Sequence, residues 1–209
     1  AARVKTSKSG MQPITGKSLF DIFSSSKSGQ VNQKRDHVLL GKERHDVGRP
    51  NNRGYPIRGI AKKDFLYLRN FETDRWPVGN PETGYLNCDG SPTKTLILEQ
   101  RRKGERKYWQ MNFGKRKQTE LYDLKKDPDC VVNLAGSEKV YKIEKSLRVE
   151  LQIELKKQKD PRMFDRGFIF DKYPFVGDWN NYYERFTTGK KTPSTGWVNR
   201  SDYERGPLK

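Results

Sequence analysis

The chain has 209 residues and a formal net charge of +17, from 43 lysines and arginines against 26 aspartates and glutamates. Only 32% of its residues are hydrophobic, so the chain is poor in core-forming residues, although 11% aromatic residues argue against a fully disordered protein. The positive charge favours a polyanionic partner, which is a nucleic acid, an anionic membrane surface or a sulfated or phosphorylated glycan.

The first 34 residues are polar and rich in Gly, Ser and Lys, and we expect a linker that holds one short helix. The helix is predicted from Lys17 to about Ser25, with a buried face formed by Leu19, Phe20, Ile22 and Phe23. The preceding stretch GMQPITGKS is close to a phosphate-binding loop. Five residues separate Gly10 from Gly16 where that loop has four, so we expect a turn at Pro13 and no nucleotide site.

Three short apolar runs, bounded by Gly, Pro, Asn and Asp, are predicted to be strands. They span residues 37–40, 55–60 and 65–68. A polar Gly/Pro/Asn loop separates the first two runs. Both histidines of the chain, His37 and His45, lie on the segment that leads into this loop.

Residues 71–92 form a loop that is too long for a plain connection, and such loops are usually functional or fixed to another surface. Its expected anchors are Trp76, Tyr85 and Leu86. Two helical segments follow at 93–102 and 105–113, and a short strand is predicted at 120–124. The expected apolar positions of the two helices are Leu96, Ile97, Tyr108, Trp109 and Phe113.

The clearest periodicity predicts a helix from Ser137 to Gln158, with Ser137 as its N-cap. Its apolar stripe, which we interpret as core packing, consists of Val140, Ile143, Leu147, Leu151 and Leu155. No periodicity continues after Pro161. We therefore divide the chain into residues 1–34, 35–160 and 161–209, and we expect the last part to be an irregular, aromatic-rich tail without a core of its own.

The chain offers few residues for a metal site. Cys88 and Cys130 form no CxxC pair and have no zinc-ligand spacing with the histidines, so we expect no metal ligands here. No apolar run approaches the roughly 18 residues that span a membrane. The start of the chain has neither an initiator Met nor an apolar leader, which is typical of a fragment or a processed piece.

Four motifs, taken in their order and spacing between residues 16 and 175, carry a resemblance to a known family. They are Gly16-Lys17-Ser18-Leu19-Phe20, Glu43-Arg44-His45-Asp46, Tyr55-Pro56-Ile57-Arg58 followed by Lys63 to Asn70, and Glu120-Leu121-Tyr122-Asp123-Leu124 with Asp127-Pro128 and Asn133-Leu134-Ala135. Together they resemble the C-terminal portion of type I sulfatases, particularly those related to heparan N-sulfatase (sulfamidase).

The resemblance implies an α+β fold. Residues 35–160 would form a small antiparallel sheet with a long packed helix, which is the C-terminal subdomain of an alkaline-phosphatase-like α/β enzyme, and residues 1–34 would end its catalytic domain. The resemblance also implies hydrolysis of a sulfate ester or N-sulfate on an anionic glycan, calcium in the full-length enzyme, and a periplasmic or secreted location.

The residues that perform sulfate hydrolysis in this family are not found in the chain. Their nucleophile is a formylglycine made from the Cys of a Cys-x-Pro/Ser-x-Arg motif, and neither Cys88 nor Cys130 fits that motif. The acidic motifs that hold calcium are absent as well. We therefore expect no catalytic residue and no metal ligand here. We expect the chain to be inactive alone, with an N-terminal sulfatase catalytic domain as its partner.

The substrate-binding candidates are His45, Asp46, Arg58 and Tyr55. By resemblance they match a His-acid pair and a Tyr-Pro-x-Arg motif at the rim of the substrate cleft. An arginine can bind a sulfate through two N–H groups, and a histidine beside an acid can donate to a sugar hydroxyl. Structural alternatives stay open: His45 pairs with Asp46 at a strand end, Arg58 forms an ion pair between domains, and Tyr55 is a packing residue.

Two other classes of function fit part of the sequence. A nucleic-acid-binding protein would explain the charge and the aromatic residues of the tail. The basic residues are spread along the chain and match no known nucleic-acid-binding module, so we do not expect nucleic acid as the partner. The third possibility is a purely structural interaction subdomain.

Overall fold

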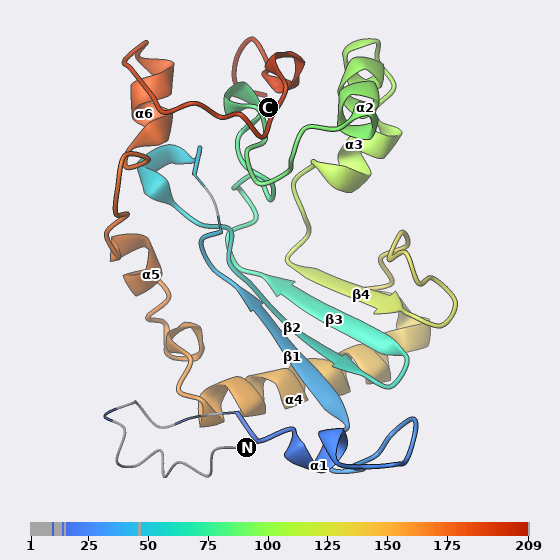
Figure 1. Cartoon of the computed structure of the whole chain (residues 1–209). Coiled ribbons are helices and arrows are strands. Elements are labelled where there is room, and N and C mark those ends of the chain that lie inside the picture. The colour runs from blue at the N-terminus through green and yellow to red at the C-terminus, as the bar shows by residue number, and fades with distance from the viewer. Residues whose placement is uncertain (1–9, 11–13, 15, 46, 209) are drawn as a thin grey trace.

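A computed structural model describes residues 10, 14, 16–45 and 47–208. Four strands form one antiparallel sheet in the order β1-β2-β3-β4 (Figure 1). They are β1 (His37–Lys42), β2 (Ile57–Lys62), β3 (Phe65–Asn70) and β4 (Thr119–Asp123). Each strand therefore lies beside the one that precedes it along the chain. The α+β class with a small antiparallel sheet is confirmed.

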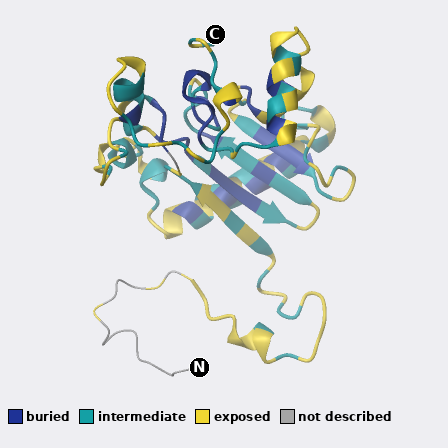
Figure 2. Cartoon of the chain, turned by 45° about the horizontal axis from the view of Figure 1, so that its top comes forward, coloured by how far each residue is buried: buried dark blue, intermediate teal, exposed yellow. Residues whose placement is uncertain are grey.

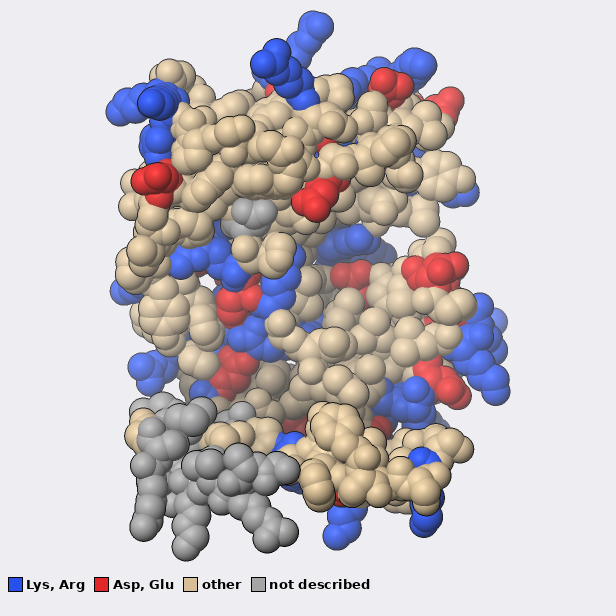
Figure 3. Space-filling view, in the orientation of Figure 1, with Lys and Arg blue, Asp and Glu red and all other residues tan. Residues whose placement is uncertain are grey.

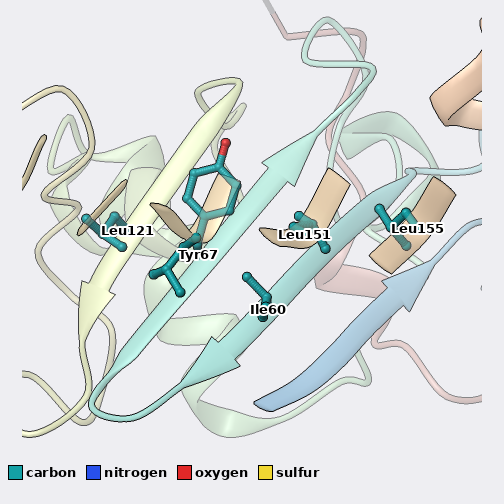
Figure 4. Close-up of a cluster of buried hydrophobic side chains, with 6 residues drawn as sticks. Ile60, Tyr67, Leu121, Leu151 and Leu155 are labelled. Carbon is teal, nitrogen blue, oxygen red and sulfur yellow. The ribbon is translucent and has the colours of Figure 1, made fainter. Parts of the chain in front are cut away.

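One face of the sheet packs against the long helix α4 (Tyr141–Lys157). Ile60 lies opposite Tyr67, and Tyr67 lies opposite Leu121, so one buried row crosses three strands. Leu151 and Leu155 of α4 complete this core (Figure 4). Leu147 is buried in the same cluster, and Val140 and Ile143 pack at its edge. The predicted apolar stripe is confirmed as core packing.

The start of α4 differs from the prediction. A short 3₁₀ turn, η4 (Glu138–Val140), precedes the helix, and Ser137 lies before that turn without a capping hydrogen bond from its side chain. The other end agrees with the expected stop at Asp160-Pro161. The Asp160 side chain accepts from the backbone N–H of Arg162 and begins η5 (Pro161–Phe164).

The opposite face of the sheet carries exposed apolar side chains. Val38 and Leu40 of β1 are 61% and 41% exposed. Leu66 and Leu68 of β3 alternate with the residues that face α4 and are half-buried. We call this surface the open sheet face.

A second core lies at the other end of the molecule from α4 (Figure 1). It joins the loop 71–92 to α2 (Pro92–Arg102) and α3 (Lys107–Asn112), and it consists of Trp76, Tyr85, Leu98, Trp109 and Phe113. The loop contains the short turn η3 (Pro81–Thr83), and its three predicted anchors are all buried. Leu96 and Tyr108 are exposed, so these two predicted core positions are wrong. On α2, Lys94 and Leu98 lie one turn apart and form the buried side, which leaves Leu96 on the outside.

The described part of the tail, residues 161–208, is more ordered than predicted. It forms η5, α5 (Ile169–Lys172), α6 (Tyr182–Thr187) and η6 (Arg200–Asp202). Its aromatic residues share a third core with Val47 and Leu86 from earlier loops. Near the end of the chain, the fully buried Asp202 lies 3.3 Å from the Lys94 ammonium of α2. The tail is therefore fixed to the rest of the molecule at several points.

The first helix is shorter than predicted, and the prediction of its buried face is wrong. The observed α1 (Phe20–Phe23) has four residues and none of them is buried. Leu19, Phe20 and Phe23 are exposed and Ile22 is half-buried. In Figure 2 the ribbon of α1 is drawn mostly in yellow, the colour of exposed residues. The predicted turn at Pro13 lies outside the described residues.

Among the described residues, no helix has the length and apolar character that a membrane span requires.

Candidate functional site

The segment from Glu43 to Tyr55, which joins β1 to β2, contains three of the four predicted site residues. We call it the 43–55 loop; it includes the short turn η2 (Pro50–Asn52). Its two ends meet, because the Tyr55 N–H donates to the Glu43 carbonyl at 3.0 Å. A side chain at Gly54 would lie 2.5 Å from that carbonyl oxygen, so the close approach requires glycine.

The Glu43 carboxylate binds two arginines that are far apart in the sequence. It accepts from Arg58 at 2.7 Å and from Arg162 at 2.6 and 2.7 Å. Arg58 also donates to Asp160 at 2.5 Å. The side chains of Arg58 and Arg162 are only 9% and 5% exposed. We call these four residues the Glu43 network.

The geometry of Arg58 favours its structural interpretation. Two further hydrogen bonds go to the carbonyls of Lys42 and Ile57, so four of its five N–H groups are used within the chain. The Phe170 ring lies 5.8 Å from the guanidinium carbon. Burial alone would lower the pKa of Arg58, but the hydrogen bonds and charges of Asp160 and Glu43 raise it.

The tail holds the 43–55 loop from outside. Arg44 donates to the carbonyls of Tyr173 and Pro174, each at 3.2 Å. The backbone N–H of Asn51 donates to Glu184 at 2.6 Å. Asn52 donates through its side chain to Asn180 and Asn181. Asn51 and Asn52 both have left-handed backbone angles, which asparagine tolerates better than most residues.

A buried arginine fixes the middle of the loop. Arg49 is 2% exposed and donates to the carbonyls of Trp76 and Pro77 at 2.9 and 3.0 Å. The loop is thus attached to the loop 71–92 as well as to the tail. This role is not predictable from the sequence, because arginine in a Gly/Pro/Asn-rich stretch is usually a surface residue.

The structure separates the predicted site residues. His45 is exposed at the surface of the loop, Arg58 lies inside the Glu43 network, and Tyr55 is fully buried. Asp46 lies outside the described residues, so its pairing with His45 stays a prediction. The Tyr55 hydroxyl has no hydrogen-bond partner among the described residues, and its pKa is raised by burial and then by the charge of Glu120.

One group of potential metal ligands occurs in the described part of the chain: Asp36, His37 and Glu150. Calcium takes six to eight oxygen ligands, so this group does not fit it. The ammonium of Lys62 already pairs with Asp36 at 2.8 Å and with Glu150 at 2.7 Å. Hydrogen bonds from Lys62 and then His37 lower the pKa of Asp36 to about 2. His37 thus belongs to an ion-pair cluster.

A comparison of this chain with protein-family models found no match, and a comparison with curated proteins found none either.

Proposed function

We propose that this chain is the C-terminal part of a sulfatase that acts on a sulfated glycan. The catalytic part would supply the formylglycine nucleophile and the calcium site. The observation that carries the proposal is the meeting of two motifs on which the resemblance rests. Glu43, from the second of the four motifs, binds the backbone of Tyr55 and the side chain of Arg58, which both come from the third.

The role we propose for His45 is contact with the substrate. Its imidazole is exposed on a loop that is attached at its base, its middle and its outer side. A binding group on a supported loop keeps its orientation, and an imidazole donates to or accepts from a sugar hydroxyl. Arg58 is a positioning residue in this proposal. It holds Glu43 just after β1, and few of its N–H groups remain for a ligand.

Exposed apolar residues are the evidence for a partner domain in this proposal. Phe20 and Phe23 of α1 and Val38 and Leu40 of β1 are exposed. Large apolar side chains that gather at a surface mark interaction sites more often than isolated ones do. We assign these exposed side chains of α1 and β1 to contacts with the catalytic part of the sulfatase, because hydrolysis requires a nucleophile that the present sequence does not contain.

The charge distribution favours a glycan over nucleic acid. On the face drawn in Figure 3, lysines and arginines lie in separate groups with acidic residues between them. A protein that follows the nucleic-acid backbone generally presents a continuous basic stripe. Dispersed cations are compatible with a glycan that carries separate anionic groups.

The experiment uses a longer protein that joins this chain to a catalytic part with the Cys-x-Pro/Ser-x-Arg motif. We expect His45→Ala to lower kcat/KM at least about tenfold, the cost of losing a hydrogen bond to a substrate, with an unchanged melting temperature. His37→Ala is the matched control and should leave kcat/KM unchanged, because His37 lies in the Lys62 ion-pair cluster. Unchanged kinetics for His45→Ala would remove His45 from the site.

A second measurement tests the assignment of the nucleophile. The purified chain alone should not hydrolyse a chromogenic aryl sulfate or N-sulfoglucosamine. Turnover by the isolated, pure chain would overturn the proposal that catalysis depends on another part of the protein.

A further inference from the structure

A cavity of about 630 Å³ lies on the open sheet face. Its floor contains Ile57, Leu66 and Leu68 of the sheet, and its walls come from residues 110–117 and 129–133. A volume of this size is typical of sites for small ligands, and such sites combine an apolar floor with a few polar groups. The cavity is lined by none of the residues of the Glu43 network and not by His45.

The cavity is positively charged. Four cations line it, namely Lys42, Lys115, Arg116 and Lys117, against two carboxylates, Glu120 and Asp129. Lys115 is engaged with the ring of Trp76, at 5.1 Å from its centroid. Glu120 is buried and accepts from Asn70 at 2.6 Å and from the hydroxyl of Tyr122, so both its oxygens are occupied. Neither carboxylate forms an ion pair with a cation of the cavity among the described residues.

Two of these cations stand out because they are half-buried without a counter-ion. In the described part of the chain, no hydrogen bond or ion pair holds the Arg116 guanidinium or the Lys42 ammonium. Burial, followed by the charge of Arg49, lowers the pKa of Lys42. Lys62 and Lys94, by contrast, lie beside carboxylates. Partly desolvated charges are costly when unpaired, so their position favours an anion in the cavity.

The Tyr55 hydroxyl is a third group without a partner. The residue is fully buried, lines the cavity, and makes no hydrogen bond through its hydroxyl among the described residues. Arg116 is close enough to counteract part of the rise in the pKa of Tyr55 that burial and Glu120 cause. A buried hydroxyl normally has a hydrogen-bond partner, so a partnerless hydroxyl on a residue that lines a basic cavity indicates an absent acceptor.

We infer that this cavity binds a small oxyanion, either free or carried on a sugar, through the Arg116 guanidinium, the Lys42 ammonium and the Tyr55 hydroxyl. Arginine suits this task because its planar fork donates two parallel hydrogen bonds to a sulfate, phosphate or carboxylate group. The apolar floor provides contact area for a ring attached to the anion. The inference stands apart from the proposed sulfatase function, since it uses neither His45 nor a catalytic domain.

Calorimetric titration tests the inference. The whole chain is titrated with inorganic sulfate, and separately with glucosamine 6-sulfate, at constant ionic strength. We expect saturable binding, and a loss of about tenfold or more in affinity for Arg116→Gln, which removes charged hydrogen bonds. The control is Lys156→Gln, an exposed lysine on α4, which should bind like the wild type. Tighter binding of the sugar sulfate would identify a saccharide-borne anion, and equal binding a free anion.

Tyr55→Phe distinguishes a ligand contact from a structural role. It removes only the hydroxyl without a partner, so the free energy of unfolding should be unchanged or slightly higher while the affinity falls several-fold. The inference is overturned if neither anion binds the wild type, if Tyr55→Phe and Arg116→Gln both bind normally while folded, or if Lys156→Gln weakens binding as much as Arg116→Gln does.

Discussion

At the scale of single residues, several buried charges hold the base of the 43–55 loop. Glu43 lies between the guanidinium groups of Arg58 and Arg162, and Asp160 supplies a second carboxylate to Arg58. The two guanidinium groups are therefore neutralised by two carboxylates at a site that is mostly shielded from water. Removal of one partner from such a group leaves a buried charge without compensation, which is far more costly than breaking an exposed pair.

Glu43→Gln should lower the free energy of unfolding by about 3 kcal/mol, because Arg58 and Arg162 lose their shared counter-ion. Urea denaturation measures this change. Glu154→Gln is the matched control, since Glu154 pairs with the exposed Lys157 at 2.6 Å, and it should cost less than about 1 kcal/mol. Equal effects of the two substitutions would contradict the assigned importance of the Glu43 network.

The sequence could predict part of this site but not its connections. Glu43 and Arg58 belong to motifs that the resemblance singles out. The structural alternative for Arg58 is an ion pair between domains, whereas the observed ion pairs of Arg58 lie within this chain. Arg162, 119 residues after Glu43, lies in a segment without periodicity, so no local pattern indicated their contact. The same holds for Arg116 and Tyr55 at the cavity, because only the folded sheet brings their segments together.

At the scale of elements, the parts with strong local periodicity were predictable. The strands and α4 follow from alternation or from three- and four-residue spacing, which depend on neighbouring residues alone. The errors occur where tertiary contacts decide. Leu96 is exposed because Lys94 takes the inner side of α2, where it donates to the carbonyls of Gly84 and Cys88. The tail is ordered because its aromatic residues reach Val47 and Leu86.

The two sides of α4 give a direct test of its packing. Leu151→Ala should destabilise the protein by about 3 kcal/mol, because it leaves a cavity between α4 and the sheet. Ile153→Ala, at a half-exposed position on the outer side of the same helix, should cost less than about 1 kcal/mol. Chemical denaturation of both variants measures the difference. Similar losses would mean that the outer side of α4 is also covered in solution.

At the scale of the whole molecule, three small cores and several buried tyrosines hold a highly charged chain together. Burial, followed by the nearby Tyr203, raises the pKa of Tyr182 to about 12. The pKa values of Tyr55 and Tyr85 are raised as well, mainly by burial. Tyr85 and Tyr182 belong to two of the three cores, so their titration reports on more than one part of the molecule.

Stability should therefore fall as the pH rises from about 10 to about 12. Above the ordinary tyrosine pKa, the unfolded chain releases protons that the folded chain retains, so unfolding becomes more favourable. Urea midpoints across this range measure the slope, and Tyr182→Phe should make it smaller. An identical slope in the wild type and in Tyr182→Phe would show that the buried Tyr182 is not linked to folding.

The central proposal is that this chain is one part of a sulfatase and that the exposed apolar side chains of α1 and β1 contact a catalytic part. The most direct measurement is to sequence the coding DNA on the amino-terminal side of Ala1. We predict that it continues in frame through a Cys-x-Pro/Ser-x-Arg motif and an Asp-Asn pair. A start codon directly before Ala1, with no such motif encoded nearby, would contradict the claim and leave a binding or scaffold role for the chain.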